Sequence, residues 1–371
     1  MENILSLNPT VCVVGKTYQI IVITERDALI SVHVGEKTYY NHCNGIRISS
    51  AGVHKISVPA AELDKERSYT IVAQKMIKRL AYFPETGPEI EKIYKFNPLE
   101  KEDNINIYHL ADVHNDYQQG INVVKNCEKA FDLLILNGDI ASKSDNFEQM
   151  ILCYKIASEV TKGEIPCIIT RGNHELRGID AENLDKYLPT DCGKSYYTFQ
   201  TGPIWGMLLD AGEDKNDESP EYGGTICCHD FRLEQEKMIH NTIKNAASQY
   251  EEDGIKYKLI ISHVPFTFKK DNPKFDIERE LFSNWAKTIK DNIKPDLMLC
   301  GHIHKVCISC PGSEQDDLGH PCTVISGAAN TPVPDNKYII TGTFININNN
   351  VAMVVANTEN EILFEEKIDL N

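Results

Sequence analysis

The chain has 371 residues, of which 42% are hydrophobic and 25% are charged, a composition that is ordinary for a folded globular protein. Its 54 acidic residues outnumber its 38 lysines and arginines, so the formal net charge is −16. This balance argues against a generally basic nucleic-acid surface and against charge-driven binding to anionic lipid. The longest apolar runs have the length of strands and fall far short of the roughly 20 residues that cross a bilayer.

Residues 1–9 lack the basic start and the apolar stretch of a secretory signal. We therefore expect a cytoplasmic protein whose 12 cysteines are mostly reduced thiols. Cys307 and Cys310, together with Cys322 and His320, could form a zinc knuckle. Their spacing is irregular, however, so loop thiols are the preferred interpretation.

The first hundred residues are predicted to be all-β. Short β-branched segments alternate with turn-forming residues, which favours a β-sandwich, and the segments are Tyr18–Thr24, Ala28–Val34, His54–Pro59 and Tyr69–Gln74. No helix is expected among them. The polar stretch Asn97–Asp103 is typical of a linker. We therefore predict an all-β domain over residues 1–100 and a second domain over residues 104–371.

After residue 104, predicted strands and helices alternate, which indicates α/β layers. The strands are Ile105–Ala111, Leu133–Leu136, Pro166–Thr170, Lys258–Ser262 and Asp296–Cys300, and the helices are 117–130, 147–161, 231–249 and 278–291. Residues 323–368 return to strands, with a hairpin turn at Asn346–Asn350. The acidic stretch Glu213–Glu221 is predicted to be an exposed loop.

Metal-ligand types of side chain follow five of these strands, at the point where each strand ends. They are Asp112, His114, Asp139, Asn173, His174, His263, His302 and His304. Because open α/β sheets build their sites at the carboxyl ends of strands, we expect these side chains to lie together. Gly138, Gly172 and Gly301 stand directly before three of them and would permit tight turns and close backbone approach.

Without His174, the set contains four histidines, two carboxylates and one amide oxygen. Nitrogen and oxygen donors of this kind suit Zn, Mn or Fe. Seven ligands are too many for one tetrahedral ion but suit two ions that share a bridging carboxylate. Paired metal ions are a recurring device for in-line displacement at phosphorus, so the sequence predicts a two-metal site that attracts a phosphate.

Taken in order, the motifs resemble the signature of the calcineurin-like metallophosphoesterases: Asp112-x-His114, Gly138-Asp139, Gly172-Asn-His-Glu175, His263 and Gly301-His-x-His304. The resemblance implies a β-sheet sandwich flanked by helices over roughly 104–371. It also implies two metal ions, the first at Asp112, His114, Asp139 and His304, the second at Asp139, Asn173, His263 and His302. His174 would be a catalytic non-ligand that hydrogen-bonds a phosphoryl oxygen or protonates the leaving group.

The N-terminal region resembles the small all-β domain that precedes the catalytic part of purple acid phosphatases, and Leu63–Tyr69 resembles the Leu…Tyr corner of fibronectin-like modules. Purple acid phosphatases have a tyrosine ligand where this chain has Ser142, and they lack the histidine found here at His114. Many other relatives have an aspartate at the Ser142 position. A tyrosinate-to-iron colour is therefore not expected.

The implied activity is hydrolysis of a small phosphate monoester or diester by attack of a metal-bound hydroxide. Arg177, three residues after His174, is a candidate for binding phosphate oxygens, the alternative being a surface salt bridge. The expected partner is a small phosphorylated substrate, with no membrane, and the net charge disfavours nucleic acid. Two other functions stay open: a nuclease, which a salt-sensitive gel shift would indicate, and an interaction module that holds metal without hydrolysing phosphoesters.

Overall fold

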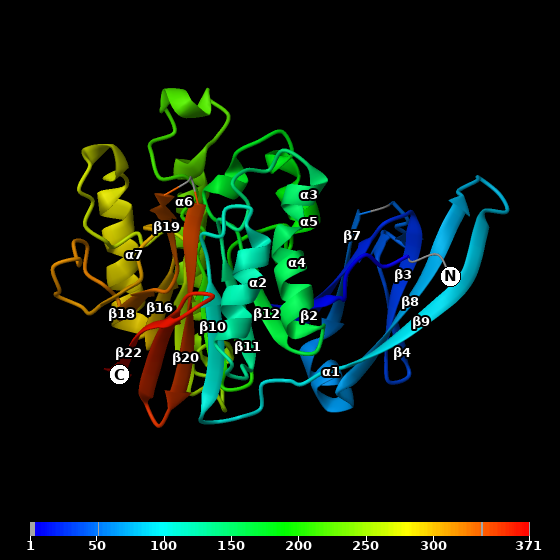
Figure 1. The fold of residues 1–371 in the computed structure, drawn as a ribbon, viewed down its shortest axis with the longest axis horizontal. Coiled ribbons are helices and arrows are strands. Elements are labelled where there is room, and N and C mark those ends of the chain that lie inside the picture. Colours follow the sequence, from blue (N-terminus) through cyan, green and yellow to red (C-terminus); the bar gives the residue numbers. More distant parts are fainter. Residues whose placement is uncertain (1–3, 51, 335–336, 371) are drawn as a thin grey trace.

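The computed structural model describes residues 4–50, 52–334 and 337–370. Two large β-sheets pack face to face, and helices cover their outer faces, so the main body has four layers (Figure 1). This arrangement confirms the predicted α/β class. None of the helices in the described ranges is long and apolar enough to cross a membrane.

The larger sheet has ten strands. Its strands after residue 104 are β10 (Ile105–Leu110), β11 (Leu133–Asn137), β12 (Pro166–Thr170), β19 (Ala329–Val333), β20 (Lys337–Asn348), β21 (Val351–Asn357) and β22 (Ile362–Asp369). The parallel strands β10, β11 and β12 form its centre. A hairpin turn at Asn349 and Asn350 joins β20 to β21, within the predicted region.

The smaller sheet has six strands. They are β13 (Tyr197–Thr201), β14 (Ile204–Leu208), β15 (Tyr257–Ile261), β16 (Leu297–Cys300), β17 (Cys307–Ser309) and β18 (Thr323–Ser326). Buried side chains of β15 and β16, such as Leu259 and Leu299, pack in one apolar cluster with Ile107 and Ile135 of the larger sheet. The two sheets are therefore held together by apolar burial between them.

Helices form the outer layers. Those beside the larger sheet are α2 (Tyr117–Asn126), α3 (Phe147–Met150), α4 (Leu152–Thr161) and α5 (Leu184–Tyr187), and those beside the smaller sheet are α6 (Cys228–Lys244) and α7 (Arg279–Asn292). Short 3₁₀ turns lie at His174–Leu176, Ala181–Asn183, Pro220–Tyr222, Ala246–Ser248 and Pro273–Phe275. The predicted helix 147–161 is divided in two at Ile151.

The N-terminal region is rich in β-strands, as predicted. Its elements are β1 (Thr10–Val14), β2 (Thr17–Thr24), β3 (Ala28–Val34), β4 (Lys37–Tyr40), β5 (His42–Cys43), β6 (Ile46–Arg47), β7 (Gly52–Pro59), α1 (Ala60–Glu66), β8 (Ser68–Lys78) and β9 (Glu85–Lys95). The expectation of no helix was wrong, since α1 lies between β7 and β8. The sequence did not reveal it because α1 has only seven residues, too few to show a helical period. The sequence prediction also omitted β9, most of whose side chains are polar and exposed.

The N-terminal region contacts the part of the chain after residue 104 through a strand pairing and through a side chain. Strand β1 pairs in parallel with β12, with Val11 opposite Pro166, so β1, β2 and β7 continue the ten-stranded sheet. The hydroxyl of Tyr69 donates a hydrogen bond to the carbonyl of Gly163 at 2.8 Å. A domain division near residue 100 stays a prediction, and both of these contacts would join the two domains.

Candidate metal centre

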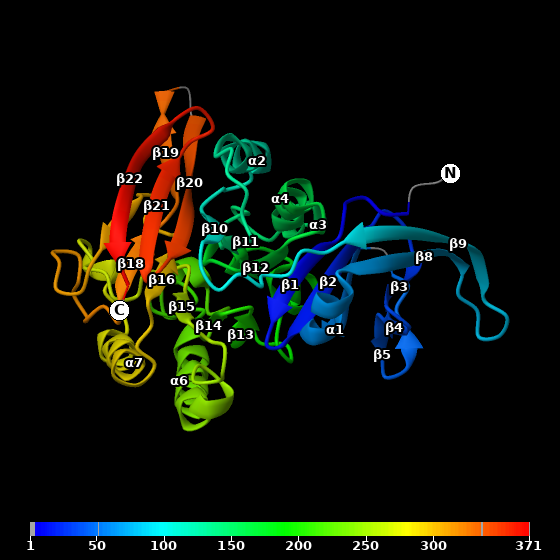
Figure 2. The ribbon, with the colours of Figure 1, turned by 90° about the horizontal axis from the view of Figure 1, so that it is seen from below.

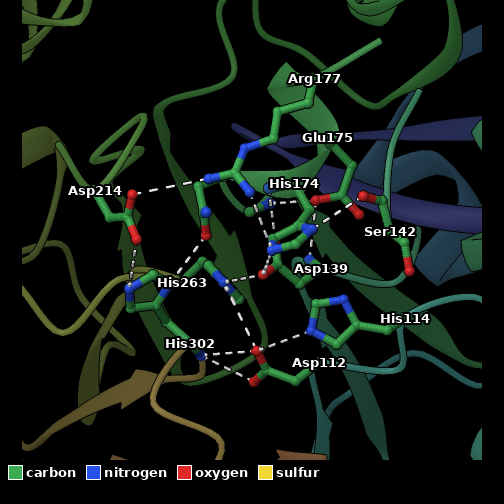
Figure 3. Close-up of polar contacts among 12 residues, drawn as sticks. Asp112, His114, Asp139, Ser142, His174, Glu175, Arg177, Asp214, His263 and His302 are labelled. Carbon is green, nitrogen blue, oxygen red and sulfur yellow. Dashed lines mark hydrogen bonds and ion pairs between the residues drawn. The ribbon is translucent and has the colours of Figure 1, made fainter. Parts of the chain in front are cut away.

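The candidate ligands lie on loops that leave the carboxyl ends of five strands, where the two sheets meet. Figure 3 shows several of these side chains pointing toward one another. Asp112 and His114 follow β10, Asp139 follows β11, and Asn173 and His174 follow β12. From the smaller sheet, His263 follows β15, and His302 and His304 follow β16. The sheet topology therefore gathers residues that are far apart in sequence, such as His114 and His304, which are 190 positions apart.

Five of these residues have left-handed backbone conformations, which are uncommon outside glycine. The φ angles are 54° at Asp112, 46° at His114, 51° at Asp139, 71° at His302 and 51° at His304. Such conformations cost free energy, and they concentrate at functional sites, where the surrounding structure holds them. Here the loops are tied together by hydrogen bonds from the Asp112 N–H to Gly138 O and from the His114 N–H to Asp139 O, at 3.1 and 3.0 Å.

Two glycines allow the β11 and β12 loops to approach closely. Gly138 has φ 79°, and a Cβ atom added there would lie 2.5 Å from the backbone nitrogen of Gly172. A Cβ at Gly172 would lie 2.2 Å from Oδ1 of Asp139. Both distances are impossible for real atoms, so any larger residue would push the Asp139 and Asn173 loops apart.

The first group of candidate ligands surrounds the buried Asp112 carboxylate. Its Oδ1 lies 3.4 Å from Nε2 of His304 and 4.0 Å from Nε2 of His114. The two Nε2 atoms of His114 and His304 face each other at 3.0 Å. If both imidazoles are neutral, only one proton can lie between these two nitrogens. A metal ion, by contrast, could bind the lone pairs of both nitrogens.

The second group surrounds Asp139, which is 1% exposed. Its Oδ2 lies 3.1 Å from Nε2 of His263, and Nδ1 of His302 lies 2.9 Å from Oδ1 of Asn173. Donor atoms of Asp139, His263 and His302 lie within 4.8 Å of one another, and so do those of His114, Asp139 and His174. Asp139 therefore stands between the two groups, and geometry alone leaves His174 within ligand distance as well.

The donor set fits divalent metal ions. Nε2 of His263 is buried and faces the carboxylates of Asp139 at 3.1 Å and Asp112 at 3.9 Å, while its Nδ1 faces the carbonyl of Asn137 at 2.7 Å. Burial by itself would lower the pKa of His263, but the nearby Asp139 and Asp112 carboxylates raise it to about 10. The pocket thus attracts positive charge at the atom that a metal ion would bind.

Glu175 holds the loops from behind, a role that sequence reasoning did not assign to it. Its carboxylate accepts hydrogen bonds from the backbone N–H groups of Asp139, Ala141 and Gly172 at 2.9, 3.0 and 2.7 Å. Burial and the neighbouring Asp139 carboxylate raise the pKa of Glu175, and the hydrogen bonds from Ala141 and Gly172 oppose that shift. The only sequence signal was its place in the Gly-Asn-His-Glu motif.

His174 is fixed by its backbone surroundings. Nδ1 of His174 lies 2.9 Å from the carbonyl oxygen of Ser142, which can only accept, so Nδ1 carries the proton. The other ring nitrogen, Nε2, lies 3.9 Å from Oδ2 of Asp139 and 3.3 Å from Nη1 of Arg177. Nε2 is thus the ring atom turned toward the centre.

Arg177 forms a two-point ion pair with Glu213, whose Oε1 and Oε2 accept from Nε and Nη2, each at 2.6 Å. Glu213 is only 1% exposed and Lys215 is also buried, so the prediction that Glu213–Glu221 is an exposed loop was wrong at these two residues. The next residue, Asp214, places Oδ2 3.7 Å from Nε2 of His302 (Figure 3). Neither acid had a recognisable motif, because their partners lie far away in sequence.

The proposed zinc knuckle does not form among the described residues. Nε2 of His320 bonds to Ser309 at 2.9 Å, and its Nδ1 faces Asp316 at 3.2 Å. The groups of donor atoms that lie close enough for a metal ion in the described ranges contain only residues of the strand-end site. Cys307, Cys310 and Cys322 remain free thiols.

Comparison with known proteins identifies a family that matches this chain. A family model described as calcineurin-like phosphoesterase matches residues 105–306. No curated protein matches the chain in sequence. Among solved structures, a dimetal phosphatase from Danio rerio is 12% identical with a TM-score of 0.48, covering 74% of this chain and 100% of its own.

Two further solved structures extend over the N-terminal region. A structure of PhoD is 11% identical with a TM-score of 0.48, and the match covers 99% of this chain and 93% of PhoD. A cold-active protein-tyrosine phosphatase from a psychrophilic Shewanella is 10% identical with a TM-score of 0.32, covering 97% and 98% of the two chains.

Proposed function

The chain belongs to the calcineurin-like phosphoesterases, which makes it a metal-dependent hydrolase of phosphoric esters, and we propose that its substrates are small phosphate monoesters or diesters. The observation that carries this proposal is the position of Asp139 between two groups of nitrogen and oxygen donors. One carboxylate shared by two groups is the arrangement that a pair of metal ions needs for displacement at phosphorus.

In this proposal the first ion would be held by Asp112, His114, Asp139 and His304, and the second by Asp139, Asn173, His263 and His302. Zn, Mn and Fe suit this donor set. When bound, the two ions would supply a nucleophilic water at neutral pH and neutralise charge on the phosphoryl oxygens. The buried Asp112 and Asp139 carboxylates keep the site anionic enough to retain the ions.

His174 would serve the leaving group. Its Nδ1 proton is directed to the carbonyl of Ser142, so Nε2 is the atom that can hold or deliver a proton on the substrate side. Arg177 would bind a phosphoryl oxygen through the Nη1 hydrogen that does not face Nε2 of His174, since Glu213 occupies its Nε and Nη2. The ion pair with Glu213 fixes the plane of the guanidinium, which supports Arg177 as an orienting residue.

The test is a panel of phosphate monoesters, diesters and nucleotides, assayed with protein stripped of metal and then supplied with Mn, Fe, Zn, Co or Mg. We expect hydrolysis of small monoesters or diesters with Mn, Fe or Zn, loss of activity in Asp139→Asn, and full activity in the exposed matched control Asp253→Asn. Metal uptake without hydrolysis of any substrate would favour an interaction module. Salt-sensitive binding and cleavage of DNA or RNA would favour a nuclease.

A further inference from the structure

The hairpin formed by β8 and β9 projects from the end of the molecule opposite the C-terminal strands (Figures 1 and 2). Its tip carries five consecutive apolar residues, Leu80–Pro84, and all five are exposed. Tyr82 and Phe83 are 81% and 91% exposed. A contiguous exposed apolar run of this kind is costly in water and marks an interaction site.

Strand pairing is a poor use for this hairpin. Strand β9 lies at the edge of its four-stranded sheet, but Pro88 removes one of its backbone donors, and its exposed glutamates repel a copy of the same strand. Proline and charge on an edge strand are the usual means of preventing edge-to-edge association. The side chains of the tip, rather than the backbone of the edge, are therefore the groups available to a partner.

A cavity lies at the base of the same hairpin. It has a volume of about 580 Å³ and is lined on its apolar side by Ile4, Leu5, Leu7, Ile71, Ala73 and Ile90. A cavity of this size accommodates a group as large as several side chains. Its polar rim includes Glu91, Lys92 and Glu159, and Glu159 already pairs with Lys125. Glu91 is exposed, and Lys78 lies at the end of β8 just before the tip.

The tip cannot fill the cavity of its own chain. Ile71 lies in the part of β8 nearer the body, and the extended strand from Ile71 to Lys78 spans about 23 Å at 3.3 Å per residue. The tip lies beyond Lys78, so the length of the hairpin keeps the apolar tip away from the cavity of its own chain. The tip of a second molecule is not limited in this way.

We propose that a second copy of this chain binds here, in a two-fold dimer in which the tip of each hairpin enters the cavity at the base of the partner's hairpin. A two-fold arrangement forms each contact twice, as closed dimers do. Two hairpins lying side by side in opposite directions would bury Tyr82 and Phe83 and bring Lys78 of each chain to Glu91 of its partner. This local attraction offsets part of the repulsion between two chains of charge −16.

The experiment is sedimentation equilibrium of the full chain over a range of concentrations. We expect a dimer, and we expect the double variant Tyr82→Ser, Phe83→Ser to raise its Kd by about 100-fold, since buried aromatic anchors dominate interface energies. Ile46→Ser, which removes another exposed apolar side chain of the same region, 65% exposed, should leave the Kd unchanged. A monomeric wild-type chain at its highest soluble concentration, or a dimer indifferent to the tip variant, would overturn the proposal.

A charge exchange tests the cavity separately from the tip. Lys78→Glu should weaken the dimer, and adding Glu91→Lys to it should restore the dimer, because the exchanged charges meet across the two-fold interface. Circular dichroism checks that each variant folds. Failure of the second substitution to restore the dimer would remove the cavity from the interface. Tip-dependent binding of a monomer to vesicles of phosphatidylserine would instead assign the tip to a lipid surface and contradict the dimer.

Discussion

The backbone carbonyl of Ser142 accepts a hydrogen bond from Nδ1 of His174 at 2.9 Å. An imidazole whose Nδ1 proton is held in this way presents Nε2 to its other side, in a fixed orientation. Position 142 carries a serine in this chain, but the group that orients His174 belongs to the main chain. The identity of the side chain at 142 should therefore matter little to catalysis.

This relationship gives a paired prediction. Ser142→Ala should leave kcat within about threefold of wild type, because the carbonyl remains in place. His174→Ala should retain both metal ions yet lower kcat by about 10²–10⁴-fold, the usual contribution of one acid–base group. Kinetics and elemental analysis on the same samples measure both. Metal loss in His174→Ala as large as in His263→Ala would make His174 a ligand instead.

Substrates with different leaving groups separate the two roles open to His174. A residue that protonates the leaving oxygen is needed most when that oxygen is strongly basic. His174→Ala should therefore lose more activity on alkyl phosphates than on nitrophenyl phosphate. Equal losses on both would indicate that His174 only stabilises the phosphoryl oxygens.

Glu175 should be essential to stability rather than to chemistry. Its carboxylate accepts from three buried backbone N–H groups, and Glu175→Gln would turn an amide NH₂ against at least one of them. We expect the free energy of unfolding to fall by about 2–4 kcal/mol, the cost of unsatisfied buried polar groups. Urea denaturation measures this, with Glu148→Gln, whose side chain is 70% exposed, as a control. Equal stability of the two variants would show that the loops do not depend on Glu175.

The position of Asp139 between the two donor groups predicts how metal content should change. Asp139→Asn should lose most of both ions, whereas Asp112→Asn should mainly empty one site, since Asp112 is grouped with His114 and His304. Elemental analysis after dialysis against a weak chelator gives the two stoichiometries. Two full metal equivalents in Asp139→Asn would rule out the shared carboxylate.

Sequence patterns predicted the central strands well because these strands are buried on both faces and read as continuous apolar runs. Strands β10, β11, β12, β15 and β16 all end within one residue of their predicted ends. The candidate ligands follow from the same pattern, since each stands just beyond a strand. Residues such as Glu213 and Asp214 could not be predicted in this way, because only the folded chain brings them to Arg177 and His302.

Long-range pairing was also invisible in the sequence. The segment Thr10–Val14 is one apolar run among several, and nothing local to it indicates that β1 pairs with β12 rather than with a strand of its own region. Helix α1 and strand β9 were missed for a different reason, since one is too short and the other too polar to show a period. Packing against neighbours decides the conformation of such segments.

His54 should make the stability of the N-terminal region depend on pH. It is fully buried between Asn41 and Thr24, and burial lowers its pKa to about 4, outweighing the attraction of Asp27. The unfolded chain, with a histidine pKa near 6.5, binds more protons between pH 4 and about 6.5, so stability falls as the pH drops through this range. Over the whole range the loss from this residue is about 3 kcal/mol.

Urea denaturation of wild type and His54→Gln at pH 4, 5, 6 and 7 measures that contribution. The variant should be less stable than wild type at pH 7, where glutamine packs less well, and the difference should shrink or reverse toward pH 4. Parallel pH profiles for the two proteins would mean that His54 is not protonated on unfolding in this range.

The predicted boundary near residue 100 can be tested by cleavage. Residues 100–102 are exposed, and the Lys101 side chain is 50% exposed, so limited trypsin digestion should cut there first. Because β1 pairs with β12 and Tyr69 bonds to Gly163, we expect the two fragments to stay together on size-exclusion chromatography. A chain that starts at residue 101 should still bind metal, since every candidate ligand lies after it, but it should be less soluble because β12 would gain an uncovered edge. Fragments that separate and remain soluble would instead show two independent domains, and resistance to cleavage with an insoluble truncation would show one integrated unit.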